Sequence, residues 1–314
     1  MLRYIVMRIL STIPVMAIVA LFVFAMLRLA PGDPAAVIAG DYASAEDVAR
    51  IRDQLGLNEP IAIQFVSWLG QLLKGDLGTS IFTNLPVSTM IAQRIEPTIM
   101  LSASTMLFAI AVAVPLGTVA AWKSGSLIDR FVMLFSVGGF SIPVFVLGYM
   151  LIYVLAMWLK ILPVQGYRSP FEDGLLPFLY HIALPAMTLS VIFIALIARM
   201  TRASVMESLG EDYIRTARAK GQSEFKVLLR HALRNAAVPI VTVIGIGVAL
   251  LIGGVVVTES VFNIPGVGRL VLDAVLARDY PIIQGLILFF SFIYIIINLI
   301  IDLSYTFLDP RIRY

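Results

Sequence analysis

The chain has 314 residues, of which 60% are hydrophobic and only 14% are charged, and its formal net charge at pH 7 is +3. Soluble globular domains carry about 25% charged residues, so this composition excludes a water-soluble protein and indicates an integral membrane protein. The absence of cysteine excludes disulfide bonds and thiolate metal sites.

Six runs without Asp, Glu, Lys or Arg each exceed the roughly 18 residues that a helix needs to cross the hydrocarbon core of a bilayer. In lipid only helices and closed barrels satisfy all backbone polar groups, and the runs lack the alternation of barrel strands. The sequence therefore predicts an all-α membrane protein with six transmembrane helices. The runs are residues 9–27, 98–122, 131–159, 174–198, 235–258 and 280–301.

The first run also has features of a signal peptide, because Arg3 and Arg8 precede it as a basic n-region does. The run is long for the apolar part of a signal peptide, and it leads into Pro31 without a small-x-small cleavage site. We interpret it as an uncleaved membrane anchor, with a signal peptide as the alternative.

Lys and Arg are unevenly distributed between the connecting segments. With the N-terminus inside, the cytoplasmic segments hold 14 of the 23 basic residues, and the external segments hold nine beside 13 acidic residues. The positive-inside rule then predicts that both termini are cytoplasmic. The cytoplasmic segments are residues 1–8, 123–130, 199–234 and 302–314.

The longest external segment is expected to form small amphipathic helices. Ser44 and Asp47 form a capping box for the first, which ends at Gly56, and Asn58 and Pro60 begin a second that ends at Gly75. The predicted organisation is an N-terminal transmembrane helix (1–30), the external helical segment (31–97), a five-helix core (98–305) with a cytoplasmic loop at 201–235, and a cytoplasmic tail (306–314).

Residues 211–236 differ from the rest of the chain, because nine of these 26 residues are charged. Glu211 suits the first turn of a helix, Gly221 suits a left-handed cap, and Ser223 suits the start of a second helix that runs through residue 233. The pattern predicts two surface helices around a glycine corner, with the small residues Ala217 and Ala219 facing outward. From charge alone, an interfacial loop that contacts anionic lipid is the alternative.

The letters RTARAKG at 215–221, followed after nine residues by HAL, resemble the EAA loop of ABC importer permeases. That loop has the pattern Glu-Ala-Ala, three residues, Gly, nine residues, Ile-x-Leu-Pro. This chain has Arg215 for the Glu, Thr216 for the first Ala, His231 for the Ile and Arg234 for the Pro. These departures are similar to the variant in the dipeptide, oligopeptide and nickel importer branch.

Other motifs along the chain resemble the same branch, among them RLAPGDPA, KGDLGTSI, LIGGVVVTESVFNIPGVGRL, RDYP and LDPRIRY. The resemblance implies a multi-pass permease of the bacterial inner membrane. Its implied partners are a second homologous permease subunit, two ATP-binding subunits and an extracytoplasmic solute-binding protein. The implied ATPase-coupling residues are Arg215, Thr216, Ala217, Arg218, Ala219, Lys220, Gly221 and Glu224.

A P-loop needs a Gly-Lys pair to hold phosphates, and this chain has none. We therefore expect a chain that is not itself an enzyme, without catalytic, cofactor or metal sites, whose partner subunits bind ATP and Mg²⁺. Its other expected partner is the lipid bilayer, and no nucleic acid is expected.

Two other classes of protein remain as alternatives. A secondary transporter would place ionisable groups within its spans, and Asp302 is the one candidate acid near membrane depth. Its position close to the cytoplasmic end favours an interfacial role with Arg311 or Arg8 over a relay. A membrane enzyme is disfavoured, because His181 and His231 lie on opposite predicted sides and no nucleophile elbow is present.

Small residues on the third and fifth helices are candidates for the translocation pathway or for close helix packing, and packing is favoured because small residues serve it throughout membrane bundles. A hinge at the proline of the third helix is a further hypothesis. These residues are Ser136, Gly139, Ser141, Pro143, Gly245, Ala249 and Gly253.

Beyond the fifth helix, Glu259 is a candidate for the outer gate, because the segment resembles one near that gate in the family. Asn263, Pro265, Gly266 and Gly268 predict a tight turn after it. Di- and oligopeptides are the expected substrates, and the branch also includes importers for glutathione, opines, oligosaccharides and nickel.

Overall fold

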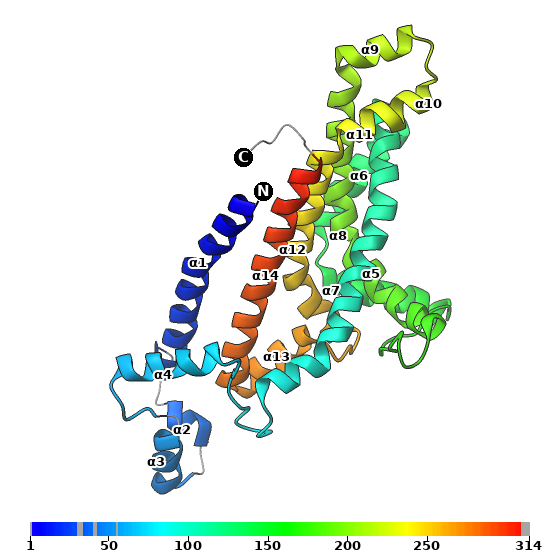
Figure 1. The fold of residues 1–314 in the computed structure, drawn as a ribbon. Helices are drawn as coiled ribbons and strands as arrows, with labels where there is room; N and C mark the ends of the chain where they lie inside the picture. The colour runs from blue at the N-terminus through cyan, green and yellow to red at the C-terminus, as the bar shows by residue number, and fades with distance from the viewer. Residues whose placement is uncertain (1, 30–33, 40–42, 55, 309–314) are drawn as a thin grey trace. The chain divides into compact units, whose positions relative to one another are not determined.

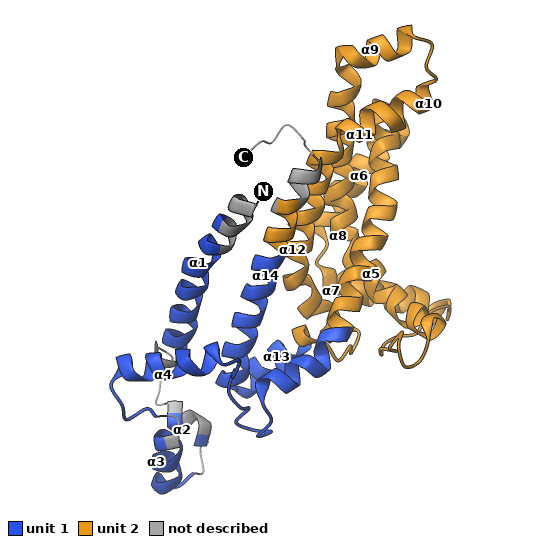
Figure 2. Cartoon of the chain, in the orientation of Figure 1, with its two compact units in different colours: residues 1–96, 269–296 blue, residues 97–268, 297–314 orange. Residues whose placement is uncertain are grey.

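The structure is a computed structural model that describes residues 2–29, 34–39, 43–54 and 56–308. Within these ranges the secondary structure is helical, apart from an isolated bridge between Thr79 and Pro86, in agreement with the predicted all-α class. The chain forms two compact units, residues 1–96 with 269–296 (unit 1) and residues 97–268 with 297–314 (unit 2) (Figures 1 and 2). Most of the predicted tail lies outside the described residues.

Unit 1 contains the predicted external segment and the helices around it. Its elements are α1 (Leu2–Leu29), α2 (Pro34–Ala39), α3 (Ala45–Gln54), α4 (Ile61–Leu73), the beginning of α5 (Val87–Trp122), most of α13 (Val267–Ala277) and the first part of α14 (Tyr280–Leu308).

The capping box before α3 is confirmed. The Asp47 backbone N–H donates to Ser44 Oγ at 3.1 Å, and the Ser44 N–H donates to Asp47 Oδ2 at 3.4 Å. Hydrogen bonds from Ser44 lower the pKa of the Asp47 carboxyl group. Gly56 and Gly75 have φ angles of +62° and +83°. These left-handed conformations, which glycine adopts without a steric penalty, end the two helices as predicted.

Aromatic and polar contacts join the elements of unit 1. Phe24 of α1 packs edge-on against Phe65 of α4, with ring centroids 5.0 Å apart. Gln284 of α14 donates through Nε2 to the backbone carbonyl of Val23 at 2.9 Å. The hydroxyl of Ser80 donates to Asp279 Oδ2 at 2.6 Å, and both residues are buried, so the loop before α5 is fixed to the start of α14.

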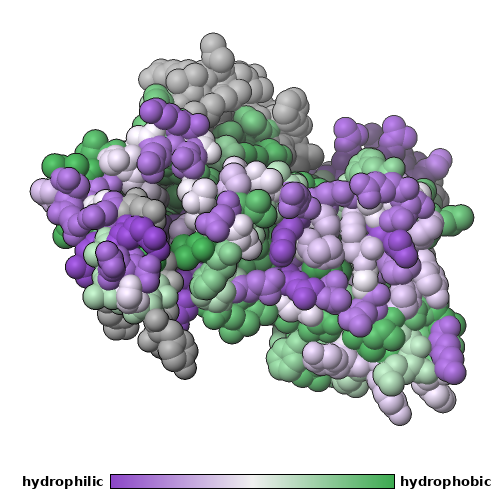
Figure 3. All heavy atoms as spheres, turned by 90° about the horizontal axis from the view of Figure 1, so that it is seen from below, coloured by the Kyte–Doolittle hydropathy of each residue, from purple (hydrophilic) through white to green (hydrophobic). Residues whose placement is uncertain are grey.

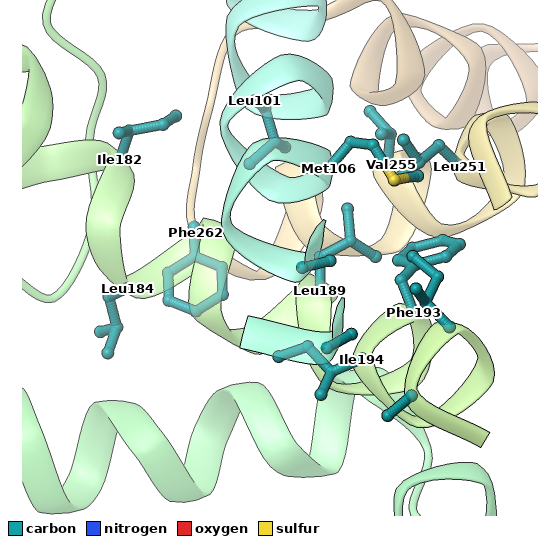
Figure 4. Close-up of a cluster of buried hydrophobic side chains, with 14 of the residues drawn as sticks. Leu101, Met106, Ile182, Leu184, Leu189, Phe193, Ile194, Leu251, Val255 and Phe262 are labelled. Carbon is teal, nitrogen blue, oxygen red and sulfur yellow. The ribbon is translucent and has the colours of Figure 1, made fainter. Parts of the chain in front are cut away.

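Unit 2 is organised around α8 (Leu175–Gly210), which packs against several helices of the same unit. Among these neighbours are α6 (Leu127–Ser141), α7 (Val144–Leu151), which continues into the π-helical segment η1 (Ile152–Trp158), and α12 (Ala237–Val261). Figure 4 shows part of the hydrophobic core, in which Met106 of α5 and Phe193 of α8 lie near Leu251 and Val255 of α12.

Glycines permit the close approach of the neighbouring helices to α8. A Cβ at Gly117 of α5 would lie 2.5 Å from the carbonyl oxygen of Ala198, and one at Gly139 of α6 would lie 3.1 Å from the Cβ of Ala195. The absence of a side chain at these two glycines lets their helices approach α8 closely.

Four helices in the described part of the chain are long and apolar enough to cross a bilayer. They cover residues 87–122, 175–210, 237–261 and 280–301, and α6 with α7 and η1 adds a fifth if the pair is one span. The described apolar stretch of α1, Leu10–Met26, is too short for the same criterion. Six spans therefore stay a prediction.

The expected third span is not one straight helix. Its two halves, α6 and α7, meet at an angle of 106°. Ile142 between them has an extended backbone (φ −97°, ψ 122°), and Pro143 is the N-cap residue of α7. Proline disfavours the helical conformation of the residue before it and lacks an N–H to donate to the preceding turn. The continuous helix over residues 131–159 is thus wrong, and the break falls where the hinge was placed.

A largely buried ion pair fixes the start of α6 to the C-terminal half of α8. Arg202 binds both carboxylate oxygens of Asp129, with Nη2 2.8 Å from Oδ2. Asp129 is 4% exposed and also accepts the backbone N–H of Gly125 at 2.9 Å. Its own N–H donates to the hydroxyl of Ser126, so the acid is held in place from both sides.

We predict that Asp129→Asn destabilises the protein by about 1–3 kcal/mol, because the change removes the counter-charge of Arg202, whose side chain is only 22% exposed. The midpoint of thermal unfolding in detergent measures the effect. Arg215→Met is the matched control, because the Arg215–Asp212 pair is 77% and 93% exposed and such pairs contribute little. Equal midpoints for the two variants would contradict the prediction.

Candidate functional site

The basic stretch folds as two helical segments joined by a corner, all within unit 2. The first segment is α9 (Asp212–Ala219), and the second consists of α10 (Glu224–Lys226), the π-helical η2 (Val227–Ala232) and α11 (Leu233–Asn235). We call residues 211–236 the basic segment. Its helix, corner and helix agree with the sequence-based prediction, whereas no contact in the structure tests its coupling role.

Gly221 forms the corner. Its φ is +74°, and its N–H donates to the carbonyl of Arg218 at 2.9 Å. Open space surrounds the position at which a Cβ would lie, so the backbone conformation, and not crowding, requires glycine here. Lys220 is the C-cap of α9. The predicted left-handed glycine cap is confirmed.

The basic segment is attached to the helix bundle by a small hydrophobic cluster. Ile214 of α9, Val227 of η2 and Val205 of α8 have no exposed surface and belong to this cluster. The cluster therefore connects the basic segment with the ends of α5, α8 and α12. Its buried members are Ala121, Val205, Ile214, Ala217, Val227, Leu228, Ala232, Ala236 and Ile240.

The outward orientation predicted for Ala217 is wrong. Ala217 is 8% exposed and belongs to the hydrophobic cluster, whereas Ala219 is exposed. Ile214 and Ala217 are three residues apart and share one face of α9, as the helical period requires. The exposed face of α9 is therefore formed by Tyr213, Arg215, Thr216, Arg218 and Ala219.

Two ion pairs lie on this exposed surface, one within α9 and one between α9 and α10. Arg218 binds Glu224 through two hydrogen bonds of 2.8 and 3.1 Å, which connect α9 with α10 across the corner. Arg215 contacts Asp212 within α9 at 3.3 Å. A two-point pair of arginine and carboxylate fixes geometry as well as charge, so Arg218 and Glu224 hold the angle of the corner.

The second segment leaves apolar side chains uncovered. Phe225 is 63% exposed and Leu229 is 41% exposed, whereas Leu228 of the same segment is buried. Leu228 belongs to the hydrophobic cluster. Phe225 and Leu229 remain open at the surface.

The candidate pathway residues on the broken third span have different surroundings. Ser136 is buried and donates to the carbonyl of Val132 at 2.8 Å, whereas Ser141 is exposed and donates to Val137 at 3.1 Å. Gly139 contacts α8, and Pro143 lies at the bend. Both serine hydroxyls thus donate hydrogen bonds to backbone carbonyls of their own helix.

The small residues of α12 do not form one surface. A Cβ at Gly245 would lie 2.7 Å from Ile301 of α14, whereas Gly253 faces open space. Ala249 is half-buried between them. A pathway role for these residues stays a prediction, and close packing is the role that the geometry gives to Gly245.

Glu259 lies within α12 and is completely buried, and not beyond the end of the helix as expected. The Thr98 hydroxyl donates to Glu259 Oε1 at 2.6 Å, and the N–H of Val267 donates to the Thr98 oxygen at 2.8 Å. A Cβ at Gly266 would overlap the carboxylate. Asn263 has a φ of +53°, as the predicted turn requires.

The sequence pattern did not reveal Thr98 or the Asp129–Arg202 pair, because their partners are distant along the chain. In the described part of the chain, no group of three His, Cys, Asp or Glu side chains is placed to hold a metal ion. The side chain of Asp302 lies outside those that the structure describes.

Two protein-family matches together cover almost the whole chain. Residues 113–314 match the family described as the inner membrane component of binding-protein-dependent transport systems, and residues 1–102 match the N-terminal family of the same transport membrane components. The chain is 56% identical to a probable peptide ABC transporter permease protein of Sinorhizobium fredii over 311 residues, which cover 99% of each chain.

Other relatives cover the chain equally well. A putative peptide transport system permease protein of Brucella abortus is 45% identical over 98% of each chain. The glutathione transport system permease protein GsiC of Salmonella typhimurium is 43% identical over the full length of both. The chain therefore belongs to the family of binding-protein-dependent ABC importer permeases, the multi-pass inner-membrane subunits of these transport systems.

Proposed function

We propose that the chain is one of two different permease subunits of an ATP-driven importer of di- and oligopeptides, and that its basic segment receives the movement of the ATPase subunits. The observation that carries the coupling role is the hydrophobic cluster around Ile214 and Val227. Packed side chains cannot be compressed, so a force on α9 passes to the ends of α5, α8 and α12.

The exposed face of α9 is the proposed contact surface for an ATPase subunit. It carries the cations Arg215 and Arg218 and the small residue Ala219, which permits close approach of another surface. Phe225 and Leu229 extend this surface with apolar contact area. An apolar centre with arginine at its edge is a common composition for protein interfaces.

Peptides are the proposed substrates, because the relatives with 56% and 45% identity carry peptide permease names. Glutathione is the second candidate, since the glutathione permease is 43% identical over its whole length. Both candidates share the energy source, ATP, and membership of the family disfavours the secondary transporter.

We predict that Ala219→Arg weakens binding of the ATPase subunits at least about tenfold, which corresponds to about 1.4 kcal/mol, because the long side chain blocks close approach. Insertion and thermal stability of the permease stay unchanged, since Ala219 is exposed. Co-purification of the ATPase subunits with the permease measures binding. Ala219→Ser is the matched control, and normal co-purification of the arginine variant would refute the contact.

Ala217→Leu, unlike Ala219→Arg, should lower the stability of the permease itself. Its larger side chain overpacks the cluster, which costs about 1–3 kcal/mol, and the thermal midpoint of the permease alone should fall. An unchanged midpoint would show that Ala217 is not packed as described.

The energy source and the substrate can be tested in one experiment. The purified chain alone should hydrolyse no ATP, because it lacks a Gly-Lys pair for a P-loop. Liposomes with the complete complex and its binding protein should accumulate a labelled peptide, and a change of the P-loop lysine of the partners should stop uptake. Accumulation of glutathione but not of peptides would select the second candidate.

The orientation has its own test, since the chain has no cysteine of its own. Single cysteines at the exposed positions Ser44 and Phe171 should react with a membrane-impermeant thiol reagent from outside. A cysteine at Ser223 should react only after the inner membrane is opened, because the positive-inside rule places the basic segment inside. External labelling at Ser223 would reverse the topology.

A further inference from the structure

Helix α4 of unit 1 has no charged residue along its 13 positions, yet large apolar side chains on it are exposed. Val66 is 68% exposed and Leu73 is 81% exposed. Neither belongs to the cluster in which Trp68 and Leu72 pack against α1. The helix thus has more apolar surface than its contact with α1 covers.

The side chains of α4 divide into three strips along the helix. At 3.6 residues per turn, Phe65, Trp68 and Leu72 share the strip that packs on α1. The polar residues Gln64, Ser67 and Gln71 form a second strip, and Ala62, Val66, Leu69 and Leu73 form a third. The polar and the free apolar strips lie on opposite sides of the helix.

The polar strip borders a pocket of about 470 Å³ in unit 1. Gln64, Ser67 and Gln71 line it from α4 together with Ile63 and Trp68. The carboxylate residues that line it are Asp53 at the end of α3 and Glu59 and Asp76 in the adjoining loops. Ionised carboxylate groups are costly to remove from contact with water. The polar side of α4 therefore faces an aqueous space, and the free apolar strip points away from it.

The apolar strip continues the exposed apolar surface of α1 in the same unit. Ile18 and Phe22 of α1 are 68% and 66% exposed, and α4 crosses the end of α1 that carries Phe24 (Figure 1). Figure 3 shows hydrophilic (purple) and hydrophobic (green) residues side by side on the face that is seen from below. An amphipathic helix at the end of a span is suited to the membrane interface.

We propose that α4 lies in the plane of the membrane, with Ala62, Val66, Leu69 and Leu73 in the acyl chains of the outer leaflet and Gln64, Ser67 and Gln71 toward water. The occupant of the exposed strip is lipid. This inference rests on the proposed placement of α1 across the membrane, and it makes the external segment a membrane-bound platform instead of a free domain.

The test uses the complete transporter in lipid nanodiscs, with partner subunits that carry no cysteine. Nitroxide labels are placed one at a time at Val66 and Leu73, and at Gln64 and Gln71 as matched controls on the same helix. Power saturation compares collisions with oxygen, which concentrates in lipid, and with a water-soluble nickel chelate. A label at Ile18 of α1 reports the membrane placement on which the inference depends.

The oxygen-to-nickel ratio should be several-fold higher at Val66 and Leu73 than at Gln64 and Gln71. Preferential contact of Val66 and Leu73 with nickel would place the strip in water and overturn the proposal, and so would protection from both reagents, which would indicate a protein partner. Nickel contact at Ile18 would instead refute the placement of α1. Each labelled complex must first show ATP-dependent uptake in liposomes before it is transferred to nanodiscs, and Ala62 replaces any position at which the label prevents assembly.

Discussion

Contact with α8 is the constraint on which the arrangement of unit 2 depends. Gly117 and Gly139 allow α5 and α6 to reach its backbone, and a Cβ at Gly254 of α12 would lie 2.7 Å from Leu189. Helices in lipid gain no hydrophobic free energy from meeting each other, so close van der Waals contact and buried polar pairs must stabilise them. The Asp129–Arg202 pair supplies such a polar contact between α6 and α8.

The same helix connects the core with the basic segment. Its residue Val205 belongs to the cluster that buries Ile214 of α9 and Val227 of η2. Packed interfaces change between discrete arrangements and do not deform continuously. A movement of α9 must therefore either displace the ends of α5, α8 and α12 or break the cluster, and the first outcome is the one that a transporter can use.

The sequence was sufficient to predict what depends on local chemistry. Glycine at position 221 and the Ser44–Asp47 capping box are properties of a few adjacent residues, and both are present in the structure. Four of the six apolar runs likewise correspond to long helices in the described part of the chain. What could not be predicted depends on contacts across the fold: Arg202 lies 73 residues from Asp129, and the charges of α9 alone do not determine which face of so short a helix is buried.

The broken third span and the buried acid at the end of α12 show the same limit in different ways. Proline indicated that residue 143 was special, but only packing against neighbours determines the angle of 106°. For Glu259, the glycines that were read as turn residues are also the positions at which a side chain would collide with its carboxylate or with Val256. Thr98 bonds both Glu259 and the loop at Val267. These hydrogen bonds therefore connect the loop rigidly to the last turn of α12. Any opening at this end must move the two together, because a rotation of the Glu259 side chain alone would leave a buried carboxylate without its hydrogen-bond partners.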